Sequence, residues 1–433
     1  MNKLSYIIFS GLFLLMLSSY GQVVPSPAPA QTKGIVLNGA TLHLGNGEII
    51  ENGTLAFANG KIVHCGGEVS DFVGYEVIDV SGKHIYPGFI LPNTPLGLVE
   101  VNAVRASVDS RETGGFNPEV RSIVAYNSDS HAIPTTRTNG ILTAQIAPQA
   151  GLVSGSSSIV QLDAWNWEDA VIKMDGGIHM SWPQETLGPR WWMGETNRRP
   201  NPNYKKSIEA LTQTLMDGAV YAGESSPPTI NLKLEAMKGL YDGSKTMFVE
   251  VNNAKAIIKS VNFLKKHGVQ KIVVVGASQA WYAKDFLKAH NIPVILRDVH
   301  SLPSTTEEDV DMPYKLPALL HKEGITVCLG YRNPFSARNL PFFAGTTAGY
   351  GLSKEEALSL ITSNTAKVLG VENRLGTLAI GKDATLFVSS GDALDMRTNI
   401  LEHAFIEGRK IELDDKHQML YRRYKEKYEA MKE

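Results

Sequence analysis

The chain has 433 residues, of which 43 % are hydrophobic and 20 % are charged, and 42 basic against 44 acidic side chains give a formal net charge of -2. This length suits two domains, or one barrel with an accessory lobe. A nearly neutral chain has no long-range attraction for nucleic acid or for an anionic membrane, so we expect no nucleic-acid partner.

Residues 1–21 have the parts of a secretory signal peptide. Lys3 supplies positive charge, residues 6–17 form an apolar core, and Ser19-Tyr20-Gly21 is a small-residue cleavage site. Spanning a bilayer takes about 20 apolar residues, and neither this run nor a later one is long enough. We therefore expect an exported protein, periplasmic or extracellular, that does not span the membrane after signal cleavage. An uncleaved anchor is the alternative.

Both ends of the remaining chain are rich in short β segments. A proline-rich linker covers residues 22–33, and residues 34–84 then alternate β-rich segments with Asn-Gly turns. Residues 375–412 are again short β segments, separated by Gly and Asp turns. These two stretches predict one composite β-sandwich lobe built from both termini. Residues 413–433 predict a C-terminal helix with a solvated charged face. Cys65 and Cys328 lie in separate apolar contexts, and we expect them to be unpaired.

The middle of the chain, residues 85–374, alternates apolar strands with helical patterns. The predicted strands are Ile141–Ile146, Met247–Val251, Lys271–Val275, Ile292–Leu296 and Ile325–Leu329, and the predicted helices are Ala254–His267, Ala280–His290 and Pro313–Glu323. This spacing predicts parallel strands in an α/β fold. Residues 98–245 are less regular and predict barrel elements with long excursions over the C-terminal face of the barrel.

The passage from lobe to barrel falls at Pro87-Gly88, where a turn precedes a buried strand that ends at Asn93-Thr94-Pro95. In parallel α/β folds, the C-terminal ends of strands carry the chemistry. This strand end should therefore face a site, although its residues offer no acid, base or strong metal ligand.

The most specific motifs are ITSNTAKVLGV at 361–371, GTLAIGKDATL at 376–386 and IEGR at 406–409. Together with the β-rich ends and the α/β middle, they resemble the amidohydrolase superfamily, in particular its imidazolonepropionase-like and dihydroorotase-like branch. The resemblance covers about residues 34–412. It implies a distorted (β/α)₈ TIM barrel beside a composite β-sandwich lobe, and hydrolysis of non-peptide C–N bonds, often in cyclic amides.

Members of this family normally hold zinc or another divalent metal, starting with a His-x-His pair on the first barrel strand. The matching positions here are Leu91, Asn93 and Pro95. Later strand ends, where the family places a ligand His or a proton-accepting Asp, carry Glu250, the run 276–279 without His, and the run 328–332 without Asp. We therefore expect no metal and no other cofactor.

Several residues remain as candidates for a pocket at the strand ends. Asn93 and Glu250 either orient a substrate or weak ion, or form a hydrogen-bonded plug. Arg332 and Arg338 follow the last strand, where they either clamp a carboxylate or form structural ion pairs.

Ser278 and Gln279 lie between a predicted strand and a helix. Ser278 there resembles the nucleophile of a hydrolase elbow, with Asp298 and His300 following in the order of a triad, but the last glycine of the motif is replaced by alanine. An ordinary turn is the alternative. His300 alone is either a general base or a hydrogen-bonded loop residue.

Two further stretches have a binding and a structural interpretation. Residues 151–158 form a small-residue turn whose N–H groups could cradle an anion. The aromatic stretch that contains Asp163, Trp165 and Trp167 either lines an apolar ligand site or packs the excursion, and we favour packing.

Two functional hypotheses follow. The first is an amidohydrolase-type enzyme whose hydrolysis of C–N bonds is altered or residual. The second is an exported, non-catalytic pseudoenzyme that binds a small-molecule ligand or partners an active paralogue. A homo-oligomer is compatible with either hypothesis.

Overall fold

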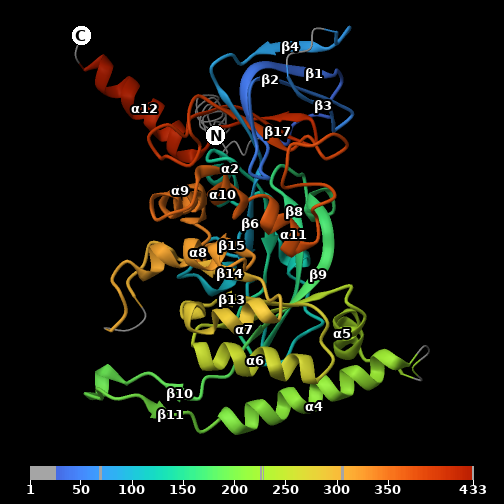
Figure 1. The fold of residues 1–433 in the computed structure, drawn as a ribbon, viewed down its shortest axis with the longest axis vertical. Helices are drawn as coiled ribbons and strands as arrows, with labels where there is room; N and C mark the ends of the chain where they lie inside the picture. The colour runs from blue at the N-terminus through green and yellow to red at the C-terminus, as the bar shows by residue number, and fades with distance from the viewer. Residues whose placement is uncertain (1–25, 68–70, 225–226, 228, 304–306, 432–433) are drawn as a thin grey trace, which may run out of the picture.

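The computed structural model describes residues 26–67, 71–224, 227, 229–303 and 307–431. The predicted signal peptide, residues 1–21, lies outside the described residues. Within the described ranges, no helix combines the length and apolarity needed to cross a membrane. Figure 1 shows a β-rich lobe at one end of the molecule, a barrel in the middle, and the long helix α4 with a small hairpin at the other end.

Both ends of the chain build the lobe, in one sheet of eight strands. The strands are β1 (Ile35–His43), β2 (Ile49–Ala58), β3 (Lys61–Gly66), β4 (Glu76–Asp79), β5 (His84–Pro87), β16 (Leu386–Ser389), β17 (Leu401–Ile406) and β18 (Arg409–Ile411). The order is β18-β17-β16-β5-β1-β2-β3, with β4 beside β1. β2 and β17 are far apart in this order, yet the rings of Phe57 and Phe405 lie 4.9 Å apart. The sheet therefore folds onto itself around a shared apolar core, which confirms the predicted composite lobe.

A second sheet of eight strands forms the barrel. Its strands are β6 (Phe89–Thr94), β7 (Ile141–Ile146), β8 (Val153–Gln161), β9 (Val171–Ser181), β12 (Thr246–Val251), β13 (Ile272–Gly276), β14 (Val294–Arg297) and β15 (Val327–Gly330). Its order is β15-β14-β13-β12-β9-β8-β7-β6. The barrel nearly closes between β15 and β6, because a side chain on Gly330 would meet the carbonyl oxygen of Pro92 at 3.2 Å.

The distortion of this barrel lies in β8. The strands from β9 to β15 pair in parallel, as do β6 and β7. β8 instead runs antiparallel to both of its neighbours. The fold is thus a distorted TIM-like barrel with a β-rich lobe, as predicted, although the sequence did not reveal the antiparallel strand.

Helices and short segments surround the barrel. The helices are α2 (Ala132–Arg137), α3 (Trp167–Ala170), α4 (Tyr204–Gly223), α5 (Leu232–Asp242), α6 (Ala254–Lys266), α7 (Lys284–Ala289), α8 (Met312–Lys322), α9 (Leu340–Gly349), α10 (Lys354–Ser359), α11 (Ser363–Leu369) and α12 (Lys416–Ala430). A hairpin, β10 (Thr186–Leu187) and β11 (Arg199–Pro200), extends from the barrel. Short 3-10 turns cover Arg105–Ser107, Ser122–Ala125, Trp191–Met193, Ala280–Ala283 and Ala337–Asn339.

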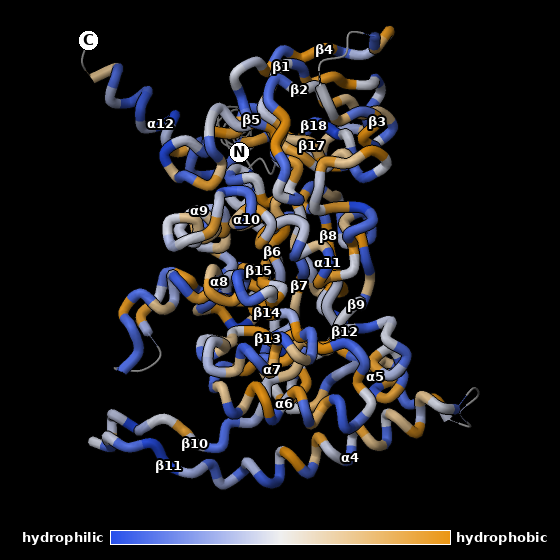
Figure 2. The backbone as a smooth tube through the Cα atoms, in the orientation of Figure 1, coloured by the Kyte–Doolittle hydropathy of each residue, from blue (hydrophilic) through white to orange (hydrophobic). Residues whose placement is uncertain are grey.

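Side chains alternate between the two faces of each barrel strand, so the barrel has an outer core and an inner core. Outward residues such as Val249 and Val274 pack with residues of the surrounding helices, such as Val261. Inward residues such as Phe248 and Ile295 form a separate cluster with the end of α11 and the loop after it. Figure 2 shows this apolar character as orange segments along the barrel strands, whereas α12 is mostly hydrophilic.

α11 packs against the end of the barrel where the strands begin, since Asn364 donates to the carbonyl of Val327 at the start of β15. At the other end, where the strands finish, the side chains of Glu250 and Arg332 are 39 % and 58 % exposed, and we call this end the open end of the barrel.

The structure bears on two cysteines and on two stretches that precede or form part of β8 and α3. The two cysteines are free, as predicted. The prediction of an anion-cradling turn at residues 151–158 is wrong, because most of this stretch belongs to β8. Its small residues let other backbone segments approach the strand closely. The preference for packing is wrong for Trp165, which is 65 % exposed, because it lies on a surface loop before α3.

Candidate functional site

A layer of polar side chains lies inside the barrel. Along β12 and β14 it comes two residues after the inward-facing apolar residues, closer to the C-terminal end of each strand. On β12, Glu250 follows Phe248, and on β14, Arg297 follows Ile295. The same layer contains three residues of the antiparallel part of the sheet, Gln145 on β7, Ser157 on β8 and His179 on β9. This layer is the candidate functional site.

The charged side of the layer is a carboxylate held by two guanidinium groups. Arg297 donates from an NH2 nitrogen to Glu250 Oε1 at 2.5 Å, and Arg332 reaches the same oxygen at 3.3 Å. The side chain of Arg297 is only 5 % exposed, whereas those of Glu250 and Arg332 are 39 % and 58 % exposed. The cluster therefore carries two positive charges and one negative charge, and it extends from the barrel interior to solvent.

Arg297 has hydrogen-bonding capacity left over. Its Nε–H is buried without a partner among the described residues. An unpaired buried donor costs free energy, on the order of 1–3 kcal/mol, and a charged donor costs more. A guanidinium donates in a fork that matches a carboxylate or phosphate. The site is thus suited to receive an anion beside Glu250.

The neutral side of the layer is a chain of hydrogen bonds. The backbone N–H of Asn93 donates to Gln145 Oε1 at 3.0 Å, which fixes the orientation of that amide. Gln145 Nε2 then donates to Ser157 Oγ at 2.9 Å, and Ser157 Oγ lies 2.8 Å from His179 Nε2. Asn93 itself has φ of 50° in the left-handed region, where asparagine is tolerated better than most residues.

His179 is a neutral imidazole in this chain of hydrogen bonds. Burial, with the positive charge of Arg297 as a second cause, lowers the pKa of His179 to about 3. Its ring is stacked on Phe248, with the ring centroids 4.8 Å apart. Because Ser157 accepts from Gln145, its own hydroxyl hydrogen is available for donation to His179 Nε2 in the tautomer that carries its proton on Nδ1.

Sequence reasoning found part of this layer and missed the rest. It selected Glu250 and Arg332, which the structure brings into contact, and Asn93, whose backbone joins the neutral side. It missed Arg297 and His179. The available signal was period-two alternation, since both residues continue the inward register of an apolar strand.

The other sequence candidates have different contacts. Ser278 uses its backbone N–H to donate to Asn252 Oδ1 at 3.4 Å, and His300 Nε2 lies 2.7 Å from Thr346 Oγ1. The elbow arrangement, in which His300 would serve Ser278, is therefore not formed. Gln279 accepts hydrogen bonds at the start of α6, from Ala254 N at 3.2 Å and from Asn253 Nδ2.

Arg338 lies in the 3-10 turn that precedes α9. Its backbone carbonyl accepts a hydrogen bond from Asn139 Nδ2 at 2.8 Å. This contact ties the loop after the last strand to the end of α2. The described contacts do not place the Arg338 guanidinium in the cluster around Glu250.

A nearly closed, mainly parallel barrel with a polar layer at the strand ends defines a distorted TIM-like (β/α)₈ fold, here joined to a β lobe from both termini. A family model described as the amidohydrolase family matches residues 185–411, slightly more than half of the chain. The chain therefore belongs to the amidohydrolase family. The match runs from the β10 hairpin through β18.

Solved structures with the same fold include an amidohydrolase from Thermotoga maritima MSB8, at 23 % identity and a TM-score of 0.77, covering 87 % of this chain and 99 % of that one. A prolidase complexed with N-methylphosphonate-L-proline has 17 % identity, a TM-score of 0.55 and coverages of 88 % and 99 %. The ochratoxinase of A. niger has 14 % identity, a TM-score of 0.54 and coverages of 87 % and 95 %. At these identities, the likeness shows the fold alone. No curated protein sequence gives a significant match.

The amidohydrolase family is usually metal-dependent. Among the described residues, no group of three or more His, Cys, Asp or Glu side chains could hold a metal ion. The one carboxylate of the layer, Glu250, is already bound by two guanidinium cations, which repel a divalent metal. The residues present do not fit the family's metal.

Proposed function

We propose that this amidohydrolase family member binds a small carboxylate-bearing ligand at the open end of its barrel, through Arg297 and Arg332 and without a divalent metal. The observation that carries the proposal is the buried Nε–H of Arg297, which has no partner among the described residues. A ligand carboxylate would satisfy that donor with a charge-assisted hydrogen bond. The second, more exposed guanidinium of Arg332 adds attraction from the solvent side.

The class of ligand is supported by the chemistry of the layer and by two fold relatives. The amide and hydroxyl groups of Gln145 and Ser157 suit an amide or peptide bond, because they can donate and accept. Relatives of the same fold were solved with N-methylphosphonate-L-proline and with methionine, and both compounds carry an amino-acid carboxylate. N-acyl amino acids and short peptides with a free carboxylate are therefore the first ligands to test.

Calorimetric titration in the presence of EDTA tests this proposal. We expect N-acyl amino acids to bind, and their carboxamide analogues, which lack the negative charge, to bind at least about tenfold more weakly. Arg332→Gln should weaken binding, while Arg397→Gln, which removes a largely exposed guanidinium from the lobe, should not. Equal affinity for acids and carboxamides would contradict the proposal.

Hydrolysis of an amide is a second candidate, supported by family membership and by the contact between Ser157 and His179. In that reaction Ser157 Oγ would attack the carbonyl carbon while His179 Nε2 takes its proton. The proton would then pass to the leaving amine, and water would release the acyl group from Ser157. The lowered pKa of His179 makes it a weak base, so we rank this reaction below ligand binding.

The two candidates are separated by the fate of the ligand. Binding alone leaves an N-acyl amino acid intact, whereas hydrolysis releases an amino acid that chromatography detects. Ser157→Ala should abolish such release if Ser157 is the nucleophile. Release that survives in Ser157→Ala would exclude the serine mechanism.

A further inference from the structure

The last described helix, α12, is exposed along its length. It covers Lys416–Ala430, and none of its 15 residues is buried. At its start, Asp415 accepts hydrogen bonds from Gln418 N at 2.8 Å and from Thr138 Oγ1 at 3.5 Å, which ties the helix to the end of α2. Beyond that point, Figure 1 shows α12 standing out from the body of the molecule. A helix of this length without tertiary packing is marginally stable in water, so a partner surface would stabilise it.

One face of α12 carries a stripe of large, partly apolar side chains. Their spacing of three and four residues places them on a common face of a helix with 3.6 residues per turn. All of them are more than half exposed. This tyrosine stripe consists of Tyr421, Tyr424, Tyr428 and Met431.

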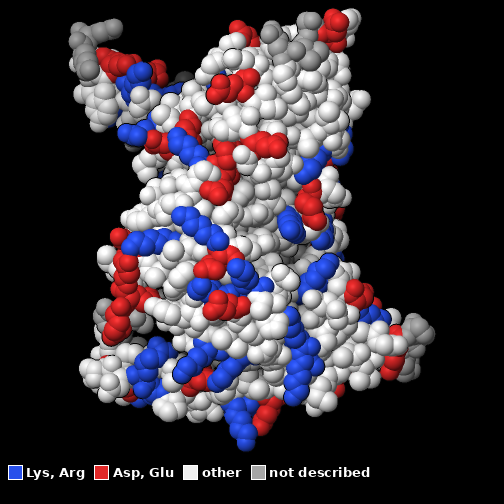
Figure 3. All heavy atoms as spheres, in the orientation of Figure 1, with Lys and Arg blue, Asp and Glu red and all other residues white. Residues whose placement is uncertain are grey.

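Basic side chains border the tyrosine stripe on both edges. At about 100° per residue, Arg423 and Lys427 fall along one edge and Lys425 along the other. Glu426 lies on the opposite face, and Glu429 pairs with Lys425 at 3.8 Å. The helix has five basic and two acidic side chains, a net charge of +3 in a chain of net charge -2. Figure 3 shows basic and acidic side chains along this projecting helix.

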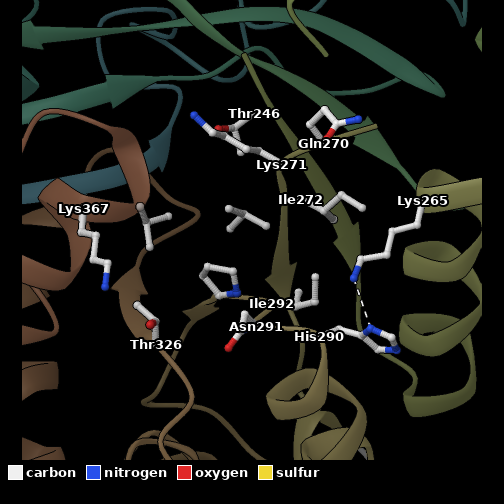
Figure 4. A pocket seen from close by; sticks show the side chains of 13 residues that line it. Thr246, Lys265, Gln270, Lys271, Ile272, His290, Asn291, Ile292, Thr326 and Lys367 are labelled. Atoms are coloured by element: carbon white, nitrogen blue, oxygen red, sulfur yellow. Dashed lines mark hydrogen bonds between the residues drawn. The ribbon is translucent and has the colours of Figure 1, made fainter. Parts of the chain in front are cut away.

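The basic side chains around the cavity at the start of strands β12 to β15 share no such face. This cavity has a volume of about 280 Å³, and Lys265, Lys271 and Lys367 line it. Figure 4 shows Lys265 and Lys367 on different sides of the opening and Lys271 directed away from it. These lysines therefore provide a matched control for the loss of positive charge at a place where cations do not converge.

The stripe and its borders together favour an anionic lipid surface. Cations on both edges would repel a second copy of the helix laid against the stripe. In a protein groove, each buried tyrosine hydroxyl needs a hydrogen-bond partner, whereas at a bilayer surface the ring lies at the level of the headgroups and its hydroxyl stays hydrated. Lysine and arginine beside such a stripe reach anionic headgroups while their stems cover apolar surface.

We propose that α12 lies on the surface of a membrane that contains anionic lipids, with the tyrosine stripe at headgroup level and Arg423, Lys425 and Lys427 near lipid phosphates. With 15 residues, the helix is shorter than the about 20 that a membrane span needs, so it would hold the chain at the surface without crossing the bilayer. This proposal does not rest on the proposed function of the barrel.

Co-sedimentation of the full chain with lipid vesicles tests this proposal. Vesicles of mixed phosphatidylglycerol and phosphatidylcholine should bind the chain, and vesicles of phosphatidylcholine alone should bind it at least about tenfold more weakly. Each basic side chain near an anionic surface contributes about fivefold to the binding constant, so Arg423→Gln/Lys427→Gln should weaken binding at least about tenfold. Tyr424→Gln/Tyr428→Gln should weaken it by a similar factor, because it removes most of the aromatic face. Since no residue of α12 is buried, both variants should keep the melting temperature of the parent chain.

Matched variants control for charge and for apolar area. Lys271→Gln/Lys367→Gln removes two exposed charges from the cavity, and Met419→Gln removes a half-exposed apolar side chain from the opposite face of α12, so neither should weaken vesicle binding. No binding to mixed vesicles, full binding by the tyrosine variant, or equal loss in either control would overturn the proposal.

Two other partners give distinct results. A dimer that forms without lipid, and that Tyr424→Gln/Tyr428→Gln abolishes in sedimentation velocity, would assign the stripe to a second copy of the chain and overturn the proposal. Binding of polyglutamate as tight as that of the mixed vesicles, and equally sensitive to the tyrosine variant, would assign it to an acidic protein and also overturn the proposal.

Discussion

The pairing of Glu250 with Arg297 predicts an asymmetry between two substitutions. Glu250→Gln leaves the Arg297 guanidinium, 5 % exposed, without its counter-charge, and stranding one member of a buried pair costs about 3–5 kcal/mol. Arg297→Met instead leaves Glu250, which is 39 % exposed and still has Arg332 at 3.3 Å. Solvent screening then reduces the cost to about 0.2–1 kcal/mol.

Urea denaturation, followed by tryptophan fluorescence, measures this difference in the free energy of unfolding. The double variant Glu250→Gln/Arg297→Met should be more stable than Glu250→Gln alone, because no buried charge is left unpaired. Glu209→Gln, which removes a largely exposed carboxylate on α4, serves as a control and should shift stability by less than about 0.5 kcal/mol. A cost for Arg297→Met equal to or above that of Glu250→Gln would refute the reasoning.

Three further predictions concern other groups. Because the folded pKa of His179, about 3, lies below its unfolded value, the unfolded chain binds the extra proton below about pH 6.5, so stability falls as the pH drops. Between pH 6.5 and 5.5 the free energy of unfolding should fall by about 1 kcal/mol because of His179. Urea denaturation of His179→Gln at both pH values should show no such fall from this residue. Gly155→Ala should lower the free energy of unfolding measured in urea by more than about 2 kcal/mol, because φ at Gly155 is +137° and a Cβ there would lie 2.4 Å from a backbone oxygen. Gly188→Ala is the control and should be neutral, because a Cβ at Gly188 would have no atom within 4 Å. Burial raises the pKa of the Cys65 thiol to about 11 and that of Cys328 to about 12, so a thiol reagent at pH 8 should label them slowly in the folded chain and rapidly in urea. Fast labelling of Cys328 in the folded chain would contradict its burial.

The sequence predicts the fold well where local signals and tertiary structure agree. The strand predicted at Ile141–Ile146 has the same bounds in the structure, and the helix predicted at Ala254–His267 ends one residue earlier. The turn at Pro87-Gly88 does separate a lobe strand from a barrel strand. In each case, an apolar run or a helical period is bounded by residues that stop it.

The antiparallel strand β8 could not be read from the sequence. Its inward positions carry small polar residues such as Ser157, so the segment has the composition of a turn. Its pairing with β7 and β9, its neighbours along the chain, makes it a strand. Tertiary pairing of this kind overrides local propensity.

The candidate site was only partly predictable for a related reason. Glu250 and Arg332 were visible as polar residues at strand ends, but their contact depends on the curvature of the barrel. Arg297 follows an apolar strand and appears in sequence as an ordinary charge before a loop. Its burial and its free Nε–H become apparent only when β14 is placed inside the closed sheet.

The central claim is that the open end of this barrel binds a carboxylate ligand without a divalent metal. The most direct measurement is a calorimetric titration of the metal-stripped chain with an N-acyl amino acid, repeated after addition of one equivalent of zinc. The account predicts the same dissociation constant in both titrations, because Arg297 and Arg332 supply the positive charge. Binding that appears only after zinc is added, with stoichiometric metal retained by the chain, would contradict it.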